Sequence, residues 1–548
     1  MPFRQNAARI AEIARILARH GWESAGRIVG FERGVRGRPH EGPIVLPPDR
    51  LRALLAELGP TYVKVGQILS TRADIIPQEY VAELEKLQDE GEPFPIEQVR
   101  EVIEAELGAP PEEIFAEFDP EPFAAASLAQ VHAARIEGVG EVVVKVQRPE
   151  ARRIIETDIQ LLYLAARALE ATFPQLKRYD LLALTDELAR RLREELDFNH
   201  EGRNTDRIRE NMADVASVVI PEVIWDYCSS RVLVLKRIRG VKVKDEEGLR
   251  RLGVDRAEVA QRLAKIMFRQ IYVDGLFHAD PHPGNVVVFE DGRIGLLDFG
   301  LVGYLDRHAR DVLVDMLLAL RREDPGRFAD DLLSLCGEKV EVDYAAFADD
   351  VARVIRGFRS QLPEERKVSA VLRDGLKVFR EHRVAVPSEI ALLVKTFIVF
   401  EGVCRRLDPQ FDTLKAAEES VLQVMAGRLE PARLVAALVD TGHDLVELLL
   451  DAPRAVGEVL RKAARGEMRV NVLHRGLEEF GARLDRTVNR LAWALVVSAC
   501  IVGSSILVQA DMPPRIHGYP VAGMISFAVS GALAAVLLWH IYRSGRLG

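Results

Sequence analysis

Three polar side chains stand at a diagnostic spacing in the middle of the chain, and any fold must bring them together. Asp280 is followed five residues later by Asn285, and Asp298 comes thirteen residues after Asn285, at the start of an Asp-Phe-Gly triplet. Phosphoryl-transfer sites have this layout: the first Asp orients or deprotonates the attacking hydroxyl, and the Asn and later Asp hold a metal ion. Hard oxygen ligands suit Mg²⁺. A hairpin loop carrying turn-forming residues by chance is the alternative, but the combined spacing favours a site for ATP and Mg²⁺.

A lysine interrupts an apolar, strand-like run upstream of this triplet. Lys145 stands in Val-Val-Val-Lys-Val at 142–146, where an unpaired charge is costly. We expect it to hold the α- and β-phosphates, paired with a carboxylate from a nearby helix. The candidates are Glu194, Glu195 and Asp197, of which we favour Glu195. The alternative for Lys145 is that it lies on an exposed edge strand and points to solvent. The alternative for the three acidic residues is that they form a solvated helix face.

A run of small residues precedes that strand, where a kinase has its glycine-rich loop: Ala124, Ala125, Ala126 and Ser127. Alanine still lets backbone N–H groups approach phosphate, but it lacks the left-handed freedom of glycine, so the loop should be stiffer. On its own this run is typical of a helix. After Gly300 there is no Ala-Pro-Glu triplet and no long polar activation segment, which counts against a conventional protein kinase.

Composition limits the partners of the chain. Asp and Glu number 83 against 74 Lys and Arg, a formal net charge of −9, which argues against nucleic acid as a partner. Four cysteines are scattered without a Cys-x-x-Cys pair, so neither a disulfide framework nor a zinc site is expected. The basic N-terminal arm has apolar residues at helical spacing. It fits equally a helix lying on an anionic membrane and a helix covering part of the fold.

Two uncharged runs lie near the C-terminus, at 491–510 and 521–539. A 20-residue helix spans about 30 Å, one hydrocarbon thickness, and the arginine-rich flanks place both ends inside. We therefore expect a transmembrane helical hairpin and a multi-pass protein of the inner (cytoplasmic) membrane with its catalytic domain in the cytoplasm. A buried hairpin in a soluble core is the alternative. A stripe of small residues would pack within the hairpin, which we favour, or against a second copy in a homodimer: Ala522, Ser526, Ser530 and Ala534.

The order of strand-like and helical patterns predicts an α+β, two-lobed, protein-kinase-like fold with an N-terminal helical extension and a C-terminal transmembrane hairpin. The expected divisions are a basic arm (1–45), a helical extension (46–117), an N-lobe with a helical insertion (118–240), a C-lobe (241–410), a helical connector (411–490) and the hairpin (491–541).

The chain resembles the UbiB family of atypical, kinase-like membrane proteins. The family's KxGQ element is matched by Lys64, Gly66 and Gln67, and its ExD element by Glu195 and Asp197. The alanine-rich loop, the strand lysine and the phosphoryl-transfer triplet described above also match. The hinge that holds adenine through its backbone would include Leu235 and Arg237, although Lys236 and Arg239 stand where we would expect glutamate.

This resemblance implies that the helix around Lys64 folds over the nucleotide site, with Lys64 near Glu195 or Asp197. Lys64 and Gln67 would then restrict access, and a peptide substrate would be excluded. It also implies an atypical kinase or ATPase that supports ubiquinone or other isoprenoid quinone synthesis. Its partners would be a membrane lipid or prenylated quinone precursor and quinone-biosynthesis proteins. The alternatives are a non-catalytic, nucleotide-gated scaffold that handles prenyl lipids, and a protein kinase whose extension moves aside.

Overall fold

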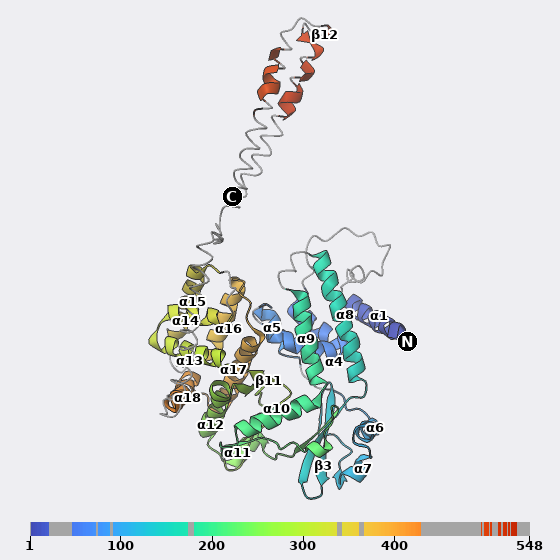
Figure 1. The fold of residues 1–548 in the computed structure, drawn as a ribbon, viewed down its shortest axis with the longest axis vertical. Helices are drawn as coiled ribbons and strands as arrows, with labels where there is room; N and C mark the ends of the chain where they lie inside the picture. The colour runs from blue at the N-terminus through green and yellow to red at the C-terminus, as the bar shows by residue number, and fades with distance from the viewer. Residues whose placement is uncertain are drawn as a thin grey trace, which may run out of the picture. The chain divides into compact units, whose positions relative to one another are not determined.

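The computed structural model divides into two compact units, Met1–Leu434 and Val435–Gly548. In the first unit it describes residues 2–20, 46–72, 75–87, 91–173, 180–336, 342–360 and 367–428. In the second it describes residue 495 and the ranges 498–503, 505–506, 513–516, 519–522, 524–526 and 528–533. All the candidate site residues belong to the first unit (Figure 1).

The N-terminal part of the first unit is helical: α1 (Pro2–Arg19), α3 (Pro48–Leu58), α4 (Pro60–Ser70) and α5 (Gln78–Leu84). Proline opens both α3 and α4, at a position where its missing N–H would lack an intrahelical partner anyway. Gly59 joins the two helices with φ of +98°, a conformation that favours glycine. α4 carries the KxGQ residues.

The helix of the N-terminal arm packs on this extension. Ile16 of α1 is buried in one apolar cluster with Leu54 and Leu58 of α3. Arg9 places its Nε 2.8 Å from Oδ1 of the fully buried Asp158. Of the two interpretations of the arm, the structure supports a helix that covers part of the fold.

A five-stranded antiparallel sheet follows, with order β1-β3-β4-β6 and β2 beside β3. Its strands are β1 (Glu117–Phe118), β2 (Ala124–Ala125), β3 (Ala129–Ile136), β4 (Gly140–Gln147) and β6 (Val232–Lys236). Val142, Val144 and Val146 are wholly buried on one face, in a cluster with α6 (Ile96–Leu107). Because side chains alternate along a strand, Lys145 projects from the opposite face. The two predicted strands, at Lys145 and at the hinge, are confirmed as β4 and β6.

The helical insertion predicted within this lobe consists of α8 (Ala151–Thr172), α9 (Leu181–Glu195) and α10 (Phe198–Asn211). α9 packs on both α8 and α4 through Leu188, Leu192 and Leu196. Asp197 ends the α9 segment and begins α10, because its side chain accepts a hydrogen bond from the Asn199 N–H. Glu195 therefore lies at the end of α9, whereas Glu201 lies on the separate helix α10.

The second lobe begins with α11 (Glu246–Leu252), α12 (Arg256–Arg269) and a π-helical turn, η3 (Gln270–Asp274). One sheet has order β5-β10-β9-β7 and a second pairs β11 with β8. These strands are β5 (Val218–Val219), β7 (Val241–Lys242), β8 (Leu276–His278), β9 (Val286–Val288), β10 (Ile294–Leu296) and β11 (Val302–Tyr304). The predicted hairpin is confirmed: β9 pairs antiparallel with β10 around Gly292.

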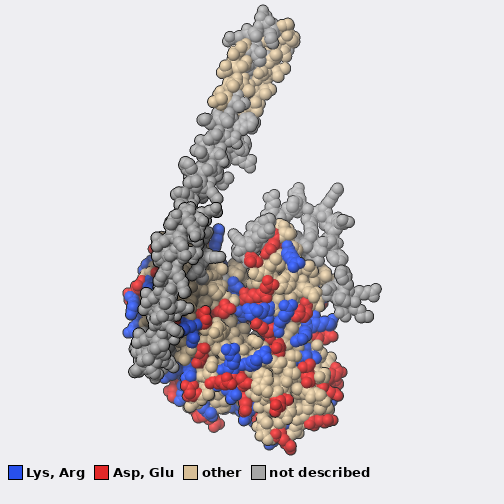
Figure 2. Space-filling model, viewed as in Figure 1, with Lys and Arg blue, Asp and Glu red and all other residues tan. Residues whose placement is uncertain are grey.

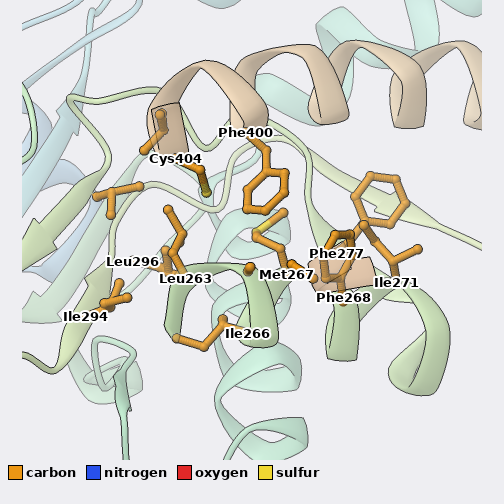
Figure 3. Packing of buried hydrophobic residues seen from close by; sticks show 14 of the residues in the cluster. Leu263, Ile266, Met267, Phe268, Ile271, Phe277, Ile294, Leu296, Phe400 and Cys404 are labelled. Carbon is orange, nitrogen blue, oxygen red and sulfur yellow. The ribbon is translucent and has the colours of Figure 1, made fainter. Parts of the chain in front are cut away.

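The core of this lobe holds the site-bearing strands in place. Figure 3 shows Met267 and Phe268 of α12 packing with Phe277 of β8, Leu296 of β10 and Phe400 of α17 (Ser388–Leu407). The remaining helices are α13 (Arg307–Arg322), α14 (Pro325–Ser334), α15 (Tyr344–Arg359), α16 (Val368–Glu381) and α18 (Thr413–Arg428). The loops after β8 and β10 thus begin at strands that pack into this largely apolar core.

The predicted transmembrane hairpin requires correction. Spanning a bilayer takes a helix of about 20 predominantly apolar residues. Among the described residues no helix is both long and apolar enough to cross a membrane. The remaining residues of the two uncharged runs lie outside the described part, as does most of the predicted connector. The α+β, kinase-like part of the prediction fits the first unit.

Candidate active site

Lys145 forms a close ion pair, but not with the predicted carboxylate. Its Nζ lies 2.7 Å from Oε2 of Glu201, and the two side chains are 20% and 7% exposed. Burial alone would lower the pKa of Lys145, but Asp298 and Glu201 outweigh it, so the pKa is raised and the ammonium stays charged. Burial raises the pKa of Glu201, and Lys145 opposes this rise. The expected pairing of Lys145 with Glu195 is wrong.

Glu201 reaches Lys145 because α10 turns back beneath the sheet after the Asp197 cap. Phe198, Glu201, Thr205 and Ile208 are all buried along one face of α10, and α10 packs on β6. The sequence contains a weak signal for this placement, since Glu201 stands at helical spacing from the apolar residues Phe198 and Ile208. The ExD resemblance drew attention to α9 instead, and Glu201 was missed.

Asp298 lies beside this pair. Its φ of +59° is unusual for a residue other than glycine, and such conformations cluster at functional sites. Gly300 donates its N–H to Oδ1 of Asp298 at 3.1 Å. The Lys145 ammonium lowers the pKa of this carboxyl to about 2 against the effect of burial, and the Gly300 N–H and Lys64 act in the same direction. The Asp298 carboxyl is therefore an anion at neutral pH.

The segment from β8 to β9 is fixed by a neutral histidine. Nδ1 of His278 accepts the Asp280 N–H at 3.1 Å, so Nε2 carries the proton that it donates to the Leu297 carbonyl at 2.9 Å. Burial lowers the pKa of His278, which favours this neutral form. Asn285 donates its Nδ2 to the Asp280 carbonyl at 3.3 Å, and its backbone carbonyl accepts the Leu297 N–H at 2.8 Å. Asp280, Asn285 and the residue before Asp298 are thus tied together.

The residues present suit a magnesium ion bound together with phosphates. Asp298 offers an ionised carboxylate, and Asn285, whose amide nitrogen already donates to Asp280, offers its Oδ1. Mg²⁺ is commonly held by one or two protein oxygens plus substrate phosphates. Among the described residues no group of three or more His, Cys, Asp or Glu side chains gathers as a metal site. The two oxygen donors, from Asp298 and Asn285, fit an ion that takes its remaining ligands from phosphates and water.

Each KxGQ residue has a distinct contact. Lys64 Nζ lies 3.2 Å from Oε2 of Glu195, one of the two neighbours that the resemblance implies. A Cβ on Gly66 would come 2.4 Å from a Leu87 methyl carbon and 3.0 Å from a Leu55 methyl carbon, so a larger residue would require these side chains to shift. Gln67 donates its Nε2 to the Leu87 carbonyl at 3.1 Å. α4 is therefore fixed on one side to α9 and on the other to the end of α5.

A second ion pair ties α4 to α9. Arg72 Nη1 lies 2.9 Å from Oε2 of Glu187, with the side chains 10% and 17% exposed. Arg72 follows Lys64 by eight residues and Glu187 precedes Glu195 by eight. Because Arg72 lies just beyond the end of α4, the two pairs hold both this helix and the segment after it against α9. Val65 and Leu192 belong to one apolar cluster there.

The alanine segment forms a β-hairpin, not a helix. Ala124 and Ala125 pair with Val131 and Gln130, and the Ala126 N–H donates to the Ala129 carbonyl at 2.7 Å to close the turn. Ser127 is buried at the end of this turn.

The expected hinge lies at the end of β6. Leu235 pairs with Val143 of β4, and Arg237 places its guanidinium over the exposed Phe123 ring at 5.7 Å. Lys236 faces Glu222 at 3.5 Å and Arg239 bonds to Glu141 at 2.7 Å. The unexpected basic side chains are thus accommodated by acidic neighbours.

Charges on the surface are mixed. On the face drawn in Figure 2, Lys and Arg of the described residues are interspersed with Asp and Glu, and neither sign forms a continuous field there. That face lacks the single-sign surface typical of nucleic-acid binding.

Three family models match the chain: the ABC1 atypical kinase-like domain at residues 86–331, the UbiB helical domain at 351–412 and the ABC1/UbiB kinase-like C-terminal domain at 475–543. A "Probable protein kinase UbiB" from Marinobacter nauticus is 34% identical over 464 residues, covering 83% of this chain and 85% of the relative. Another of that name from Aliivibrio fischeri is 32% identical over 504 residues, covering 90% of each. A solved complex of Rv3197 with erythromycin from Mycobacterium tuberculosis is 24% identical, with a TM-score of 0.46, and covers 68% of this chain and 95% of that one. The kinase-like family model and the extent of the matches to the Marinobacter and Aliivibrio relatives establish that the chain belongs to the UbiB family.

Proposed function

We propose that the chain is an atypical kinase or ATPase that binds Mg²⁺–ATP through the first unit. The observation that carries this proposal is the buried Lys145–Glu201 pair beside an Asp298 carboxyl whose pKa is about 2. A fixed ammonium next to a permanently ionised carboxylate provides one group for phosphate and one for the metal.

The roles follow from the contacts of each side chain. Lys145, oriented by Glu201, would hold the α- and β-phosphates. Asp298 and Asn285 would hold magnesium, which when bound offsets the negative charge of the phosphates. Asp280, fixed through its backbone by His278, would position the attacking group. Leu235 and Arg237, at the end of β6, would contribute the hinge that holds adenine.

The acceptor is proposed to be water or a lipid-like small molecule rather than a peptide. Only a short segment separates Gly300 from α13 at Arg307, and within it Val302–Tyr304 is already paired with β8. Little chain is left to form a docking surface for a peptide. Together with UbiB family membership, this supports a role in the synthesis of ubiquinone or another isoprenoid quinone. A prenylated precursor would be the partner.

The test is ATP hydrolysis by the full-length protein in phosphatidylcholine–phosphatidylglycerol vesicles, with and without a prenylated phenol. The variants are Asp280→Asn and the matched Asp291→Asn, which alters an exposed aspartate in the β9–β10 turn. We expect turnover that rises with the phenol, falls about 10²-fold or more in Asp280→Asn, and persists in Asp291→Asn. Equal turnover in all three proteins would contradict the assignment. Phosphate transferred to an added protein would instead favour a protein kinase.

A further inference from the structure

The alanine hairpin is fastened from outside by donors that take its carbonyl groups. Gly91 donates its N–H to the Ala125 carbonyl at 3.3 Å. The Arg148 guanidinium donates to the Ala126 carbonyl at 3.3 Å, and the Arg148 backbone N–H donates to the Leu128 carbonyl at 2.9 Å. Gly91, Arg148 and these three carbonyl groups form the carbonyl clasp.

The clasp is held by the chain that leads from the KxGQ extension to α6. Arg148 also donates to the Glu92 carbonyl and lies over the Phe94 ring at 5.2 Å. The buried Gln130 side chain accepts the Phe94 N–H at 2.9 Å and donates to the Phe94 carbonyl at 3.2 Å. Residues 91–94 are therefore bound both to the hairpin and to the end of β4.

Gly91 is required sterically. A Cβ built at this position would come 2.2 Å from the Ala126 carbonyl oxygen, which is a backbone atom and cannot rotate away as a side chain does. Any side chain at residue 91 would therefore push the linker off the hairpin or push the Ala126 peptide out of place.

The direction of these carbonyl groups matters to an anion. In a planar trans peptide the C=O and the following N–H point in opposite directions. With the Ala126 carbonyl directed at Arg148, the Ser127 N–H points toward the other side of the loop. Carbonyl oxygens repel phosphate, whereas successive backbone N–H groups attract it. The hydrogen bonds from Gly91 and Arg148 therefore fix which way the peptide groups of this loop face.

We propose that Gly91 and Arg148 are positioning residues that set the affinity of the site for nucleoside di- and triphosphates. They hold the carbonyl oxygens of the alanine hairpin away from the phosphates. This inference rests on the proposed nucleotide binding. It identifies the residues that make the site prefer ATP and ADP over adenosine. It also makes residues 91–94 a direct connection between the extension and the phosphate loop.

Binding of ATP, ADP and adenosine to the full-length protein, each with Mg²⁺ and followed by calorimetry, tests the clasp. The variants are Arg148→Ala, Arg148→Lys and Gly91→Ala, with Arg153→Ala as the control, since Arg153 is 53% exposed on α8. We expect ATP and ADP affinity to fall about tenfold in Arg148→Ala and Gly91→Ala, the effect of one charge-assisted hydrogen bond. Adenosine affinity should not change. Arg148→Lys keeps the positive charge but lacks the planar guanidinium with its several N–H donors, so its nucleotide affinities should resemble those of Arg148→Ala.

A second measurement separates local loosening from unfolding. Hydrogen exchange of the peptide spanning residues 123–131, without nucleotide, should accelerate in the clasp variants while exchange in α12 is unchanged. If the native protein binds ATP and the folded variants keep the native ratio of ATP to adenosine affinity, the clasp is refuted and the proposed function stands. If the native protein binds none of the three ligands, the proposed function itself is contradicted.

Discussion

Removing the Glu201 carboxylate should destabilise the first unit, because the Lys145 ammonium then loses its ion-pair partner at 2.7 Å. At 2.7 Å, an effective dielectric constant of about 20 gives a gross attraction of ~6 kcal/mol, of which desolvation offsets a large part. Breaking a buried pair from one side typically costs about 3–5 kcal/mol. Because Asp298 still faces Lys145, we expect Glu201→Gln to lie at the lower end, about 3 kcal/mol.

A double-mutant cycle isolates this interaction. The free energy of unfolding is measured by urea titration for the native protein, Lys145→Met, Glu201→Gln and the double variant. Trp225 is a suitable probe, because its Nε1 donates to Asp206 of α10 at 2.5 Å. Replacing the other tryptophans by Phe gives a single-tryptophan protein in which fluorescence follows α10: Trp22, Trp493 and Trp539.

The expected coupling between Lys145 and Glu201 is about 2 kcal/mol, and the same cycle with Glu195→Gln should give less than about 0.5 kcal/mol. Glu195 instead should couple with Lys64, its partner at 3.2 Å. A larger coupling of Lys145 with Glu195 than with Glu201 would refute the assignment of the pair.

Three further results are expected. Gly66→Ala should lower the free energy of unfolding by about 1–3 kcal/mol in urea titrations through overpacking, whereas a neutral effect would contradict the close helix packing. Arg72→Glu and Glu187→Arg should each destabilise by about 2 kcal/mol, and the double reversal should recover about half of the summed loss; simple addition would exclude a direct pair. Lys145 and its neighbours lower the pKa of Asp298 to about 2. The contribution of the ionised Asp298 carboxylate to the free energy of unfolding is therefore complete above the unfolded pKa of about 3.9 and is lost as pH falls toward 2. Carboxyl NMR should show this low pKa rising in Lys145→Met, and an unchanged titration would contradict the contact.

Much of the N-lobe and of the phosphoryl-transfer segment was predictable, because local patterns encode it. The apolar run around Lys145 became β4, since its alternating valines bury one face of the sheet. The Asp291-Gly292 pair between two apolar runs gave the β9–β10 hairpin. The spacing of Asp280 to Asn285 fixes both in one loop, so their proximity needs no long-range information.

The pairing across the lobe was not predictable in the same way. Whether Lys145 meets Glu195 or Glu201 depends on where α9 ends and how α10 turns after Asp197, and helix ends are poorly encoded. The clasp residue Gly91 is distant in sequence from Ala126, and its contact arises only when the linker lies on the hairpin. The transmembrane prediction relied on hydropathy over whole runs, and among the described residues no helix is long and apolar enough to cross a membrane.

The central claim is a magnesium-dependent ATP site built on Asp298, and calorimetry with ATP tests it most directly. Titrations of the full-length protein are run with Mg²⁺ and with EDTA, for the native protein, Asp298→Asn and Asp291→Asn. We predict that ATP affinity in the native protein and in Asp291→Asn rises at least tenfold with Mg²⁺, and that Asp298→Asn loses this gain. ATP binding that is equal with and without Mg²⁺, or a gain that survives in Asp298→Asn, would contradict the account.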